Sequence, residues 1–178
     1  MKTKLISLFL MVLYFTAHAQ NWTNYNMSNT SSQLCNDAVH AIAIDHDSSL
    51  WIGTLEGVSH FDGKQWTTYT TDNGLVNNNV YAIAIDSLGN KWFGTLGNGV
   101  IKFNGTEWIN YTTADGLAND YINTIAIDHL GNLWFGTEGG GVSKFDGTNW
   151  NTFNTENGLP ADNVYSIAFD AQNNKWFA

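Results

Sequence analysis

A tryptophan-containing segment recurs along the chain at an almost constant spacing. Trp51, Trp92, Trp134 and Trp176 stand 41, 42 and 42 residues apart, each in a near-copy of the phrase DHLGNLWFGT. A period of about 40–45 residues is typical of four-stranded propeller blades. The chain is therefore predicted to be an array of blades, and every residue has to be judged against its counterparts in the other copies.

Each repeat contains four short apolar segments separated by turn residues. Between positions 80 and 111, an alternating run VYAIAID is followed by KWFGT, VIKF and WINY, with Gly- and Asn-rich turns between them. Such segments are typical of strands joined by tight hairpins. We expect an all-β fold, a β-propeller of four-stranded antiparallel blades in an incomplete ring of about four. The expected blades cover about 38–71, 79–113 and 121–155, with a truncated blade at 163–178.

The first nineteen residues have the pattern of a secretory signal peptide. Lys2 and Lys4 precede an apolar run at 5–15, which is too short to span a bilayer, and Ala17-His18-Ala19 has the form of a cleavage site. Residues 20–178 are then expected to form the propeller repeats, exported to the periplasm or secreted. We expect no membrane insertion in this segment.

The piece at 21–25 (NWTNY) repeats the pattern of WTTY at 66–69. It is expected to be a partial outermost strand without its own blade. Propellers commonly close their ring by letting one terminus complete the blade that the other begins, and we expect that device here. On this interpretation the chain is the N-terminal part of a longer protein.

The negative net charge of the chain limits the kinds of ligand that it can bind. After residue 19 the chain keeps five lysines, no arginine and all sixteen acidic residues, a formal net charge of 5 minus 16, or −11. Nucleic acids need basic surfaces, and bidentate recognition of phosphate or sulfate normally uses arginine. We therefore expect no nucleic acid partner and favour a neutral or cationic small molecule or oligosaccharide. Cys35 is the only cysteine, so stability has to come from packing.

Residues present in every repeat are expected to be structural. Tryptophans at two repeat positions are interpreted as packing between blades, and the aspartates that end the inner strands as Asx-turn residues. The expected structural set is Asp45, Trp51, Trp66, Asp86, Trp92, Trp108, Asp128, Trp134, Trp150, Asp170 and Trp176.

Ligand contacts are expected where the repeats disagree. Polar residues at the loop end of the inner strands should meet at one mouth of the central channel, where amides and phenols can bind sugar hydroxyls. One set is expected to point the same way as the repeated isoleucines. Ordinary solvated loop polarity is the alternative. The candidates are His40, Asn79, Tyr81, Asn119, Asp120, Tyr121, Asn123, Asp162, Asn163 and Tyr165.

No residue pattern points to catalysis, a metal or a cofactor. His46 and His129 occupy the same turn position in different blades, too far apart to share one ion, and His40 and His60 have no repeat partner. The Gly-rich run at 136–141 lacks the lysine of a phosphate-binding loop. It is interpreted as a hairpin turn. No nucleophile and base can be distinguished from repeat scaffolding. The sequence leaves open whether this segment is an enzyme, and it favours a role without catalysis.

The residues at 128–142 (DHLGNLWFGTEGGGV), together with FDG at 145–147 and ENGL at 156–159, resemble the two-component regulator propeller repeat. The resemblance covers essentially all of the chain after residue 19. It implies the exported sensor region of a hybrid two-component system in a Gram-negative bacterium, in which the propeller binds carbohydrate breakdown products. A downstream kinase module or dimerisation of the full-length protein is implied as well.

Three functions are therefore considered. The expected one is an extracytoplasmic sensing propeller with a carbohydrate ligand. The first alternative is a secreted propeller enzyme of the lyase or glycosidase type, which would gather unrepeated acidic or histidine residues at one mouth. The second is a secreted scaffold with a C-terminal sorting domain.

Overall fold

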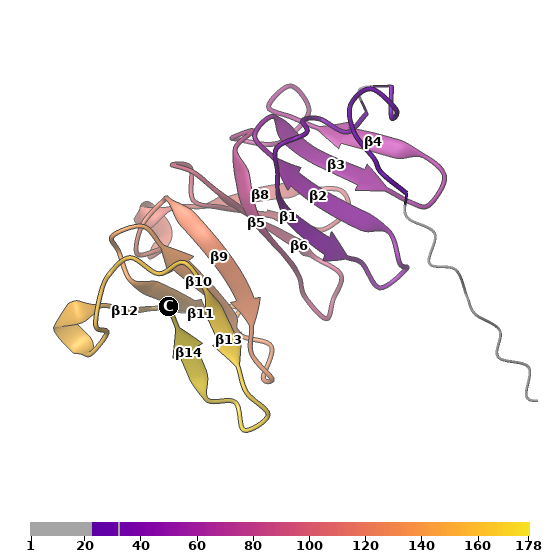
Figure 1. Cartoon of the computed structure of the whole chain (residues 1–178). Helices are drawn as coiled ribbons and strands as arrows, with labels where there is room; N and C mark the ends of the chain where they lie inside the picture. Colours follow the sequence, from indigo (N-terminus) through magenta and orange to yellow (C-terminus); the bar gives the residue numbers. More distant parts are fainter. Residues whose placement is uncertain (1–22, 32) are drawn as a thin grey trace, which may run out of the picture.

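The computed structural model describes residues 23–31 and 33–178. It consists of three four-stranded antiparallel sheets and one two-stranded sheet, arranged as an open arc of blades (Figure 1). The predicted all-β fold and the incomplete ring are thereby confirmed. The expected signal peptide lies outside the described residues.

The strands follow the predicted order from the inner to the outer edge of each blade. Their bounds are β1 (Val39–Ile44), β2 (Leu50–Thr54), β3 (Gly57–Phe61) and β4 (Trp66–Tyr69) in blade 1; β5 (Val80–Ile85), β6 (Lys91–Thr95), β7 (Val100–Phe103) and β8 (Trp108–Tyr111) in blade 2; β9 (Ile122–Ile127), β10 (Leu133–Thr137), β11 (Val142–Phe145) and β12 (Trp150–Phe153) in blade 3; and β13 (Ile167–Phe169) and β14 (Lys175–Phe177) in blade 4. Two three-residue 3₁₀ turns, η1 (Thr113–Asp115) and η2 (Thr155–Asn157), lie in the loops between blades.

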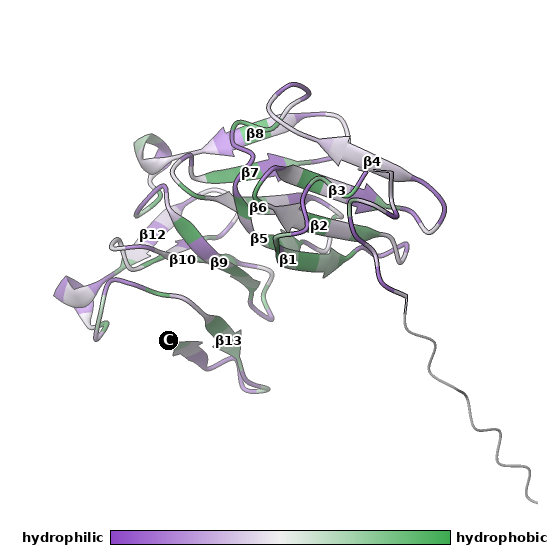
Figure 2. Ribbon diagram, turned by 45° about the horizontal axis from the view of Figure 1, so that its top comes forward, coloured by the Kyte–Doolittle hydropathy of each residue, from purple (hydrophilic) through white to green (hydrophobic). Residues whose placement is uncertain are grey.

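The inner strands β1, β5, β9 and β13 stand first in their sheets and contact one another in chain order. They therefore line the inner side of the arc. We call the end of the blades at which these strands begin the loop end, and the opposite end, where β1 turns into β2, the turn end. Figure 2 shows that hydrophobic residues concentrate in the strands, whereas the connections are mostly hydrophilic.

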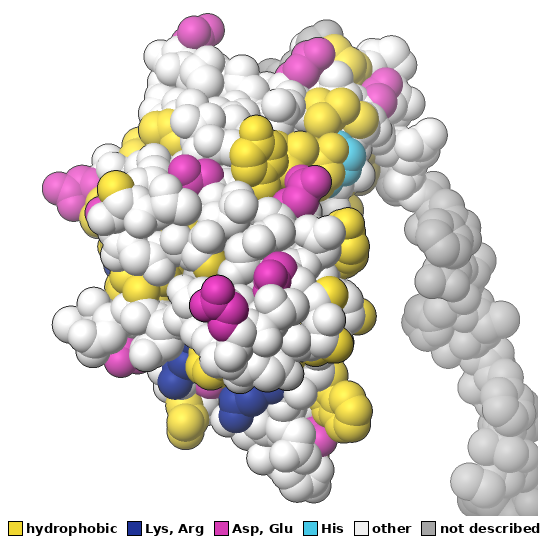
Figure 3. Space-filling model, turned by 90° about the vertical axis from the view of Figure 1, so that its left-hand side faces the viewer, with side chains coloured by type: hydrophobic (Ala, Val, Ile, Leu, Met, Phe, Trp, Pro, Cys, Tyr) yellow, Lys and Arg dark blue, Asp and Glu magenta, His cyan; other side chains and the backbone are white. Residues whose placement is uncertain are grey.

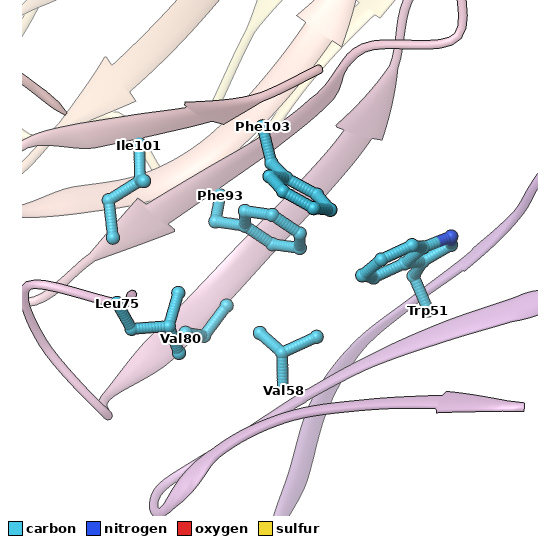
Figure 4. Packing of buried hydrophobic residues seen from close by; sticks show 7 residues of the cluster. All are labelled: Trp51, Val58, Leu75, Val80, Phe93, Ile101 and Phe103. Carbon is cyan, nitrogen blue, oxygen red and sulfur yellow. The ribbon is translucent and has the colours of Figure 1, made fainter. Parts of the chain in front are cut away.

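Hydrophobic cores form between blades, as the repeat pattern predicts. The core between blades 1 and 2 places Trp51 and Val58 of the first against Val80, Phe93 and other residues of the second (Figure 4). The corresponding residues recur at the next two junctions, where Trp92 and Trp134 take the place of Trp51. Each blade therefore buries its apolar surface against its neighbours, and the structure depends on stacking.

The repeated tryptophans also hold the turn that precedes them. The indole Nε1 of Trp92 donates to Asp86 at 3.0 Å, and Trp134 does the same to Asp128 at 3.0 Å. The bond recurs at Trp51 and at Trp176, the second of which is 63% exposed because no described strand packs on it. The aspartates accept turn amides as predicted, but the bond from the tryptophan was not predicted.

Side chains with a cation or an imidazole cover the tryptophan rings. Lys102 lies 5.3 Å from the Trp92 ring centre and Lys144 lies 5.6 Å from that of Trp134, while His60 stacks on Trp51. Each of the three lies directly across the second and third strands of its blade from the tryptophan. Cation–π and stacking contacts of this kind leave the rings unavailable to a ligand.

Lowering the pH should weaken the fold through the turn aspartates. Burial alone would raise the pKa of Asp86, but bonds from Trp92 and Asn90 outweigh it and hold the pKa below its ordinary value of 3.8. A depressed carboxyl pKa stabilises the folded state above about pH 4, and this contribution is lost as the pH falls through the folded pKa. Urea unfolding at decreasing pH should show this loss, and a smaller one in Asp86→Asn. An equal loss in the variant would contradict the assignment.

The segment before β1 imitates the connections between blades. Tyr25 packs on Phe61 and Trp66 with ring centres 5.7 and 5.6 Å away. Tyr69 packs on the matching residues of blade 2 at 5.8 and 5.5 Å. Thr23–Tyr25 forms no strand, and the first two residues of the expected strand lie outside the described part. That this piece completes a further blade stays a prediction, which the position of Tyr25 supports.

Candidate functional site

The inner strands of blades 1, 2 and 3 each have a β-bulge near the loop end. The ladders β1–β2, β5–β6 and β9–β10 all shift register at the second residue of the inner strand, which leaves His40, Tyr81 and Asn123 without a direct partner. In blade 4, Tyr165 and Ser166 both donate backbone N–H bonds to the Ala178 carbonyl. Bulges redirect side chains and are frequent beside functional sites.

The bulge changes one expectation from the sequence. Strict alternation predicted that Tyr81 points the same way as Ile83. Instead Val80 belongs to the core against which Ile83 and Ile85 pack, a spacing that strict alternation would not allow. The extra residue therefore puts Val80 on the isoleucine face and leaves Tyr81 partly exposed.

Bulge residues of adjacent blades meet. The rings of His40 and Tyr81 stack with a centroid distance of 4.1 Å and an interplanar angle of 12°. Asn123 donates from Nδ2 to the Val164 carbonyl of blade 4 at 3.2 Å, and Tyr165 is 65% exposed. His40 and Tyr81 are therefore in contact across blades 1 and 2, and Asn123 contacts the residue before Tyr165 across blades 3 and 4, all at the loop end.

Two of the predicted ligand residues, Asp120 and Asp162, already accept hydrogen bonds from their own loops. The carboxylate of Asp120 accepts from the backbone N–H of Thr113 at 2.7 Å and from its hydroxyl at 3.3 Å. Asp162 accepts the same two bonds from Thr155, at 2.7 and 2.9 Å. These bonds tie each 3₁₀ turn to the start of the next inner strand, so both aspartates help to shape the mouth.

An open hollow of about 430 Å³ lies at the loop end of blade 3, lined by Asn119, Tyr121 and Glu138. We call it the Tyr121 hollow. The backbone N–H of Glu138 donates to the Tyr121 carbonyl at 3.0 Å, which sets the two residues side by side. The side-chain oxygen of Asn119 accepts from the Tyr121 N–H at 2.9 Å, which leaves its amide nitrogen without a partner among the described residues.

Glycines allow this close packing. A Cβ on Gly140 would lie 2.6 Å from the Ala118 carbonyl oxygen, and one on Gly97 would lie 3.3 Å from the Tyr121 ring. Contacts that short require glycine or a shift of the neighbouring group. The Gly-rich run, interpreted from the sequence as a hairpin turn, therefore packs closely on Ala118 and Asn119 next to the hollow.

Glu138 is a residue that the sequence reasoning missed. Its counterparts in the β2–β3 and β6–β7 hairpins are Leu55 and Leu96, so it is the ionisable member of an otherwise apolar repeat position. Comparing this hairpin column would have identified it. Among the described side chains, none forms a hydrogen bond or an ion pair with its carboxylate, which is exposed.

The ten predicted residues thus divide into groups. Three are bulge residues of inner strands and Tyr165 lies just before β13, two line the Tyr121 hollow, and two aspartates brace loops. The remaining two, Asn79 and Asn163, lie just before inner strands, and Asn163 approaches the Gly139 position at 3.9 Å. Neither side chain has a hydrogen-bond partner among the described residues.

A second hollow of about 310 Å³ lies at the turn end between blades 2 and 3, beside Asp86, Trp92 and Lys102. The Asp86 carboxylate beside it accepts the indole N–H bond that recurs in every blade, and Trp92 is 2% exposed. We assign this second hollow to the repeat scaffold.

Within the described residues, no three His, Cys, Asp or Glu side chains are grouped so that they could hold a metal ion. None of the described helices is long and apolar enough to cross a bilayer.

Three segments of the chain match the family model of the two component regulator propeller, at residues 33–56, 74–97 and 116–139. Each match contains the loop before an inner strand, that strand and the Trp-Ile/Phe-Gly-Thr segment that follows it. No curated protein matched the sequence.

Solved structures support the same fold. An extracellular domain assigned to a hybrid two-component system of B. thetaiotaomicron is 30% identical, with a TM-score of 0.72 over 78% of this chain and 20% of that one. A second, assigned to a one-component system of the same organism, is 20% identical, with a TM-score of 0.68 over 80% and 22%. Virginiamycin B lyase from Staphylococcus aureus is 20% identical, with a TM-score of 0.62 over 79% and 48%. The chain thus spans about a fifth of the first two structures.

Proposed function

The chain is built of two-component regulator propeller repeats, and from that premise we propose that it recognises a carbohydrate outside the cytoplasm as the sensing part of a regulatory protein. The observation that carries the proposal is the gathering of unrepeated aromatic and amide side chains at the loop end. Tyr81, Tyr121 and Tyr165 are exposed or partly exposed there, and none of their hydroxyl groups forms a hydrogen bond with another described residue.

Such a surface suits sugars. Aromatic rings pack on the apolar faces of a pyranose, and amides and phenols bind its hydroxyls. Export to the periplasm or cell surface follows from the same proposal, since the similar solved structures are described as extracellular domains. A signal from the bound sugar would pass to a downstream module such as a kinase, or act through dimerisation.

Recognition is favoured over catalysis by the composition of the mouth. Acid–base catalysis generally uses two titratable groups with matched roles near the reacting bond. The Tyr121 hollow has one carboxylate, Glu138, and the described histidine of the loop end, His40, is stacked on Tyr81. The likeness to virginiamycin B lyase is one of fold.

Alanine at Tyr121 should weaken glycan binding about tenfold without unfolding the chain, because a contact residue at the centre of a site typically contributes more than 1 kcal/mol. Tyr81→Ala and Tyr165→Ala should act in the same direction. Calorimetric titration with neutral oligosaccharides measures the effect. Tyr25→Ala is the matched control, since Tyr25 is 46% exposed and Tyr121 48%, and Tyr25 lies on the outer side.

Unchanged affinity in all three mouth variants would contradict the proposal. So would a saccharide bound against Trp92 or Trp134, the residues that the repeat pattern and their burial assign to the core.

A further inference from the structure

The two ends of the blades differ in charge. All five lysines among the described residues lie toward the turn end: Lys91 and Lys175 begin second strands, Lys102 and Lys144 stand next to the end of third strands, and Lys64 is in the β3–β4 turn. In the face that Figure 3 shows, the lysines lie in the lower half and most of the acidic side chains lie above them.

Acidic residues are shared equally between the ends. Eight lie in the connections of the loop end, without a lysine: Asp37, Glu56, Asp72, Asp115, Asp120, Glu138, Glu156 and Asp162. Eight lie at the turn end together with the five lysines: Asp45, Asp47, Asp62, Asp86, Glu107, Asp128, Asp146 and Asp170. The formal charge is therefore −8 at the loop end and −3 at the turn end. A mouth of this kind attracts cations and repels anions.

Within this field Glu138 is the carboxylate best placed to contact a ligand. Asp120, beside the hollow, is already bonded by Thr113. Glu138 is exposed, lines the hollow with Tyr121 and has no partner among the described side chains. The Tyr121 ring beside it offers a π face, and an ammonium group gains from both a carboxylate and an aromatic face.

The protein's own side chains show the same recognition elsewhere. At the turn end, the ammonium of Lys91 lies 2.8 Å from the Asp45 carboxylate and 5.3 Å from the Trp51 ring centre. A carboxylate next to an aromatic ring thus already holds a primary amine across a blade junction of this molecule. The Tyr121 hollow presents the same pair of groups, in a space of about 430 Å³ that a sugar residue can enter.

We propose that the Tyr121 hollow prefers a saccharide with a free, protonated amine, whose ammonium group binds Glu138. This inference rests on the proposed carbohydrate recognition and names the class of sugar. The negative field of the loop end disfavours uronic acid and sulfated saccharides, because no lysine or arginine lies there among the described residues to pair with their anionic groups.

The test is calorimetric titration of the chain with a glucosamine trisaccharide, its N-acetylated counterpart and a galacturonic acid trisaccharide, at about pH 6, below the ordinary pKa of an amine. The glucosamine trisaccharide should bind about tenfold more tightly than the N-acetylated one, since a charge-assisted bond is replaced by a neutral one. Added salt should reduce this difference. The galacturonic acid trisaccharide should show no binding.

Glu138→Gln should remove the preference for the amine and leave the N-acetylated saccharide within about twofold. Glu107→Gln is the matched control, because it removes the same charge from an exposed residue at the turn end and should keep the preference. Equal loss in both variants would overturn the inference, since the general field rather than Glu138 would then select the amine.

The remaining outcomes separate the two proposals. Binding of the N-acetylated saccharide with no preference for the amine overturns the amine inference and leaves carbohydrate recognition intact. Tighter binding of the galacturonic acid trisaccharide does the same. Binding of none of the three saccharides overturns the inference, and failure of a wider set of neutral glycans would then count against the proposed function.

Discussion

Replacing Phe93 by alanine should lower the free energy of unfolding by about 3–5 kcal/mol. Phe93 is fully buried between blades 1 and 2, with ring centres 5.8 Å from Trp51 and 5.9 Å from Trp108. Removing its ring leaves a void that neither sheet can fill without moving, so transfer and cavity costs add. Because a domain is typically stable by only about 5–15 kcal/mol, much of the fold's margin would be lost.

Urea unfolding followed by tryptophan fluorescence measures this loss. Leu88→Ala is the control, because Leu88 is 86% exposed in the β5–β6 turn and its removal should change stability by less than about 0.5 kcal/mol. Hydrogen exchange should show the largest loss of protection in blades 1 and 2, since stacked repeats couple mainly to their neighbours. A cost no larger than that of Leu88→Ala would contradict the packing described for this junction.

The fold could be predicted because the sequence repeats the same pattern of apolar strands about every 42 residues. A strand that is apolar on both faces must be covered on both sides, and a copy of the same blade provides that cover. The tryptophan column therefore predicted the cores correctly at Trp51, Trp92 and Trp134, which are 2–3% exposed. Trp176 occupies the same column but is exposed, because a column predicts a place in the blade and not what packs on it.

The details of the mouth were harder to predict. Alternation gives the direction of a side chain only while the ladder is regular, and the bulges at His40, Tyr81 and Asn123 interrupt it. A bulge depends on pairing with the second strand, which the inner strand alone does not reveal. The position of these candidates at the loop end could be predicted, but their orientation could not.

Polarity alone also could not separate bracing residues from free ones. Asp120 and Tyr121 are adjacent, and both are polar residues in the same loop. The structure gives the aspartate two bonds to Thr113, whereas the tyrosine ring stays at the surface beside Glu138. The bond between Asp120 and Thr113 spans seven residues across a 3₁₀ turn, so polarity alone does not reveal it.

The glycine of the repeated Trp-Ile/Phe-Gly-Thr segment is required for a physical reason that the repeat alone does not reveal. A Cβ on Gly53, Gly94 or Gly136 would lie 2.8, 2.5 or 2.9 Å from a side chain of the next blade, that of Val80, Ile122 or Val164. At Gly136 the Thr124 side chain of the same blade would be nearer still, at 2.6 Å. The following threonines are fully buried, and each donates its hydroxyl to a hairpin carbonyl at 2.8–3.0 Å. In this segment the tryptophan bonds the preceding turn, the glycine allows close contact with the next blade, and the threonine bonds the hairpin that follows.

Gly94→Ala should therefore destabilise the chain by about 1–3 kcal/mol, although glycine to alanine in ordinary backbone usually stabilises. The new methyl group would lie 2.5 Å from Cγ2 of Ile122 and 3.3 Å from Cβ of Ala82, so blades 2 and 3 would have to move apart. Thermal unfolding of the purified variant measures the cost.

A double-mutant cycle identifies the cause. Ile122 is fully buried, and Ile122→Ala alone should cost about 2–5 kcal/mol by leaving a cavity at the same place. The two effects should partly offset each other, because Ile122→Ala removes Cγ2, the atom nearest to the new methyl group at 94, while Cβ of residue 122 stays 2.9 Å away. The double variant should then lose less stability than the sum of the single variants. Strict additivity would show that Gly94 is required for some reason other than contact with the inner strand of the next blade.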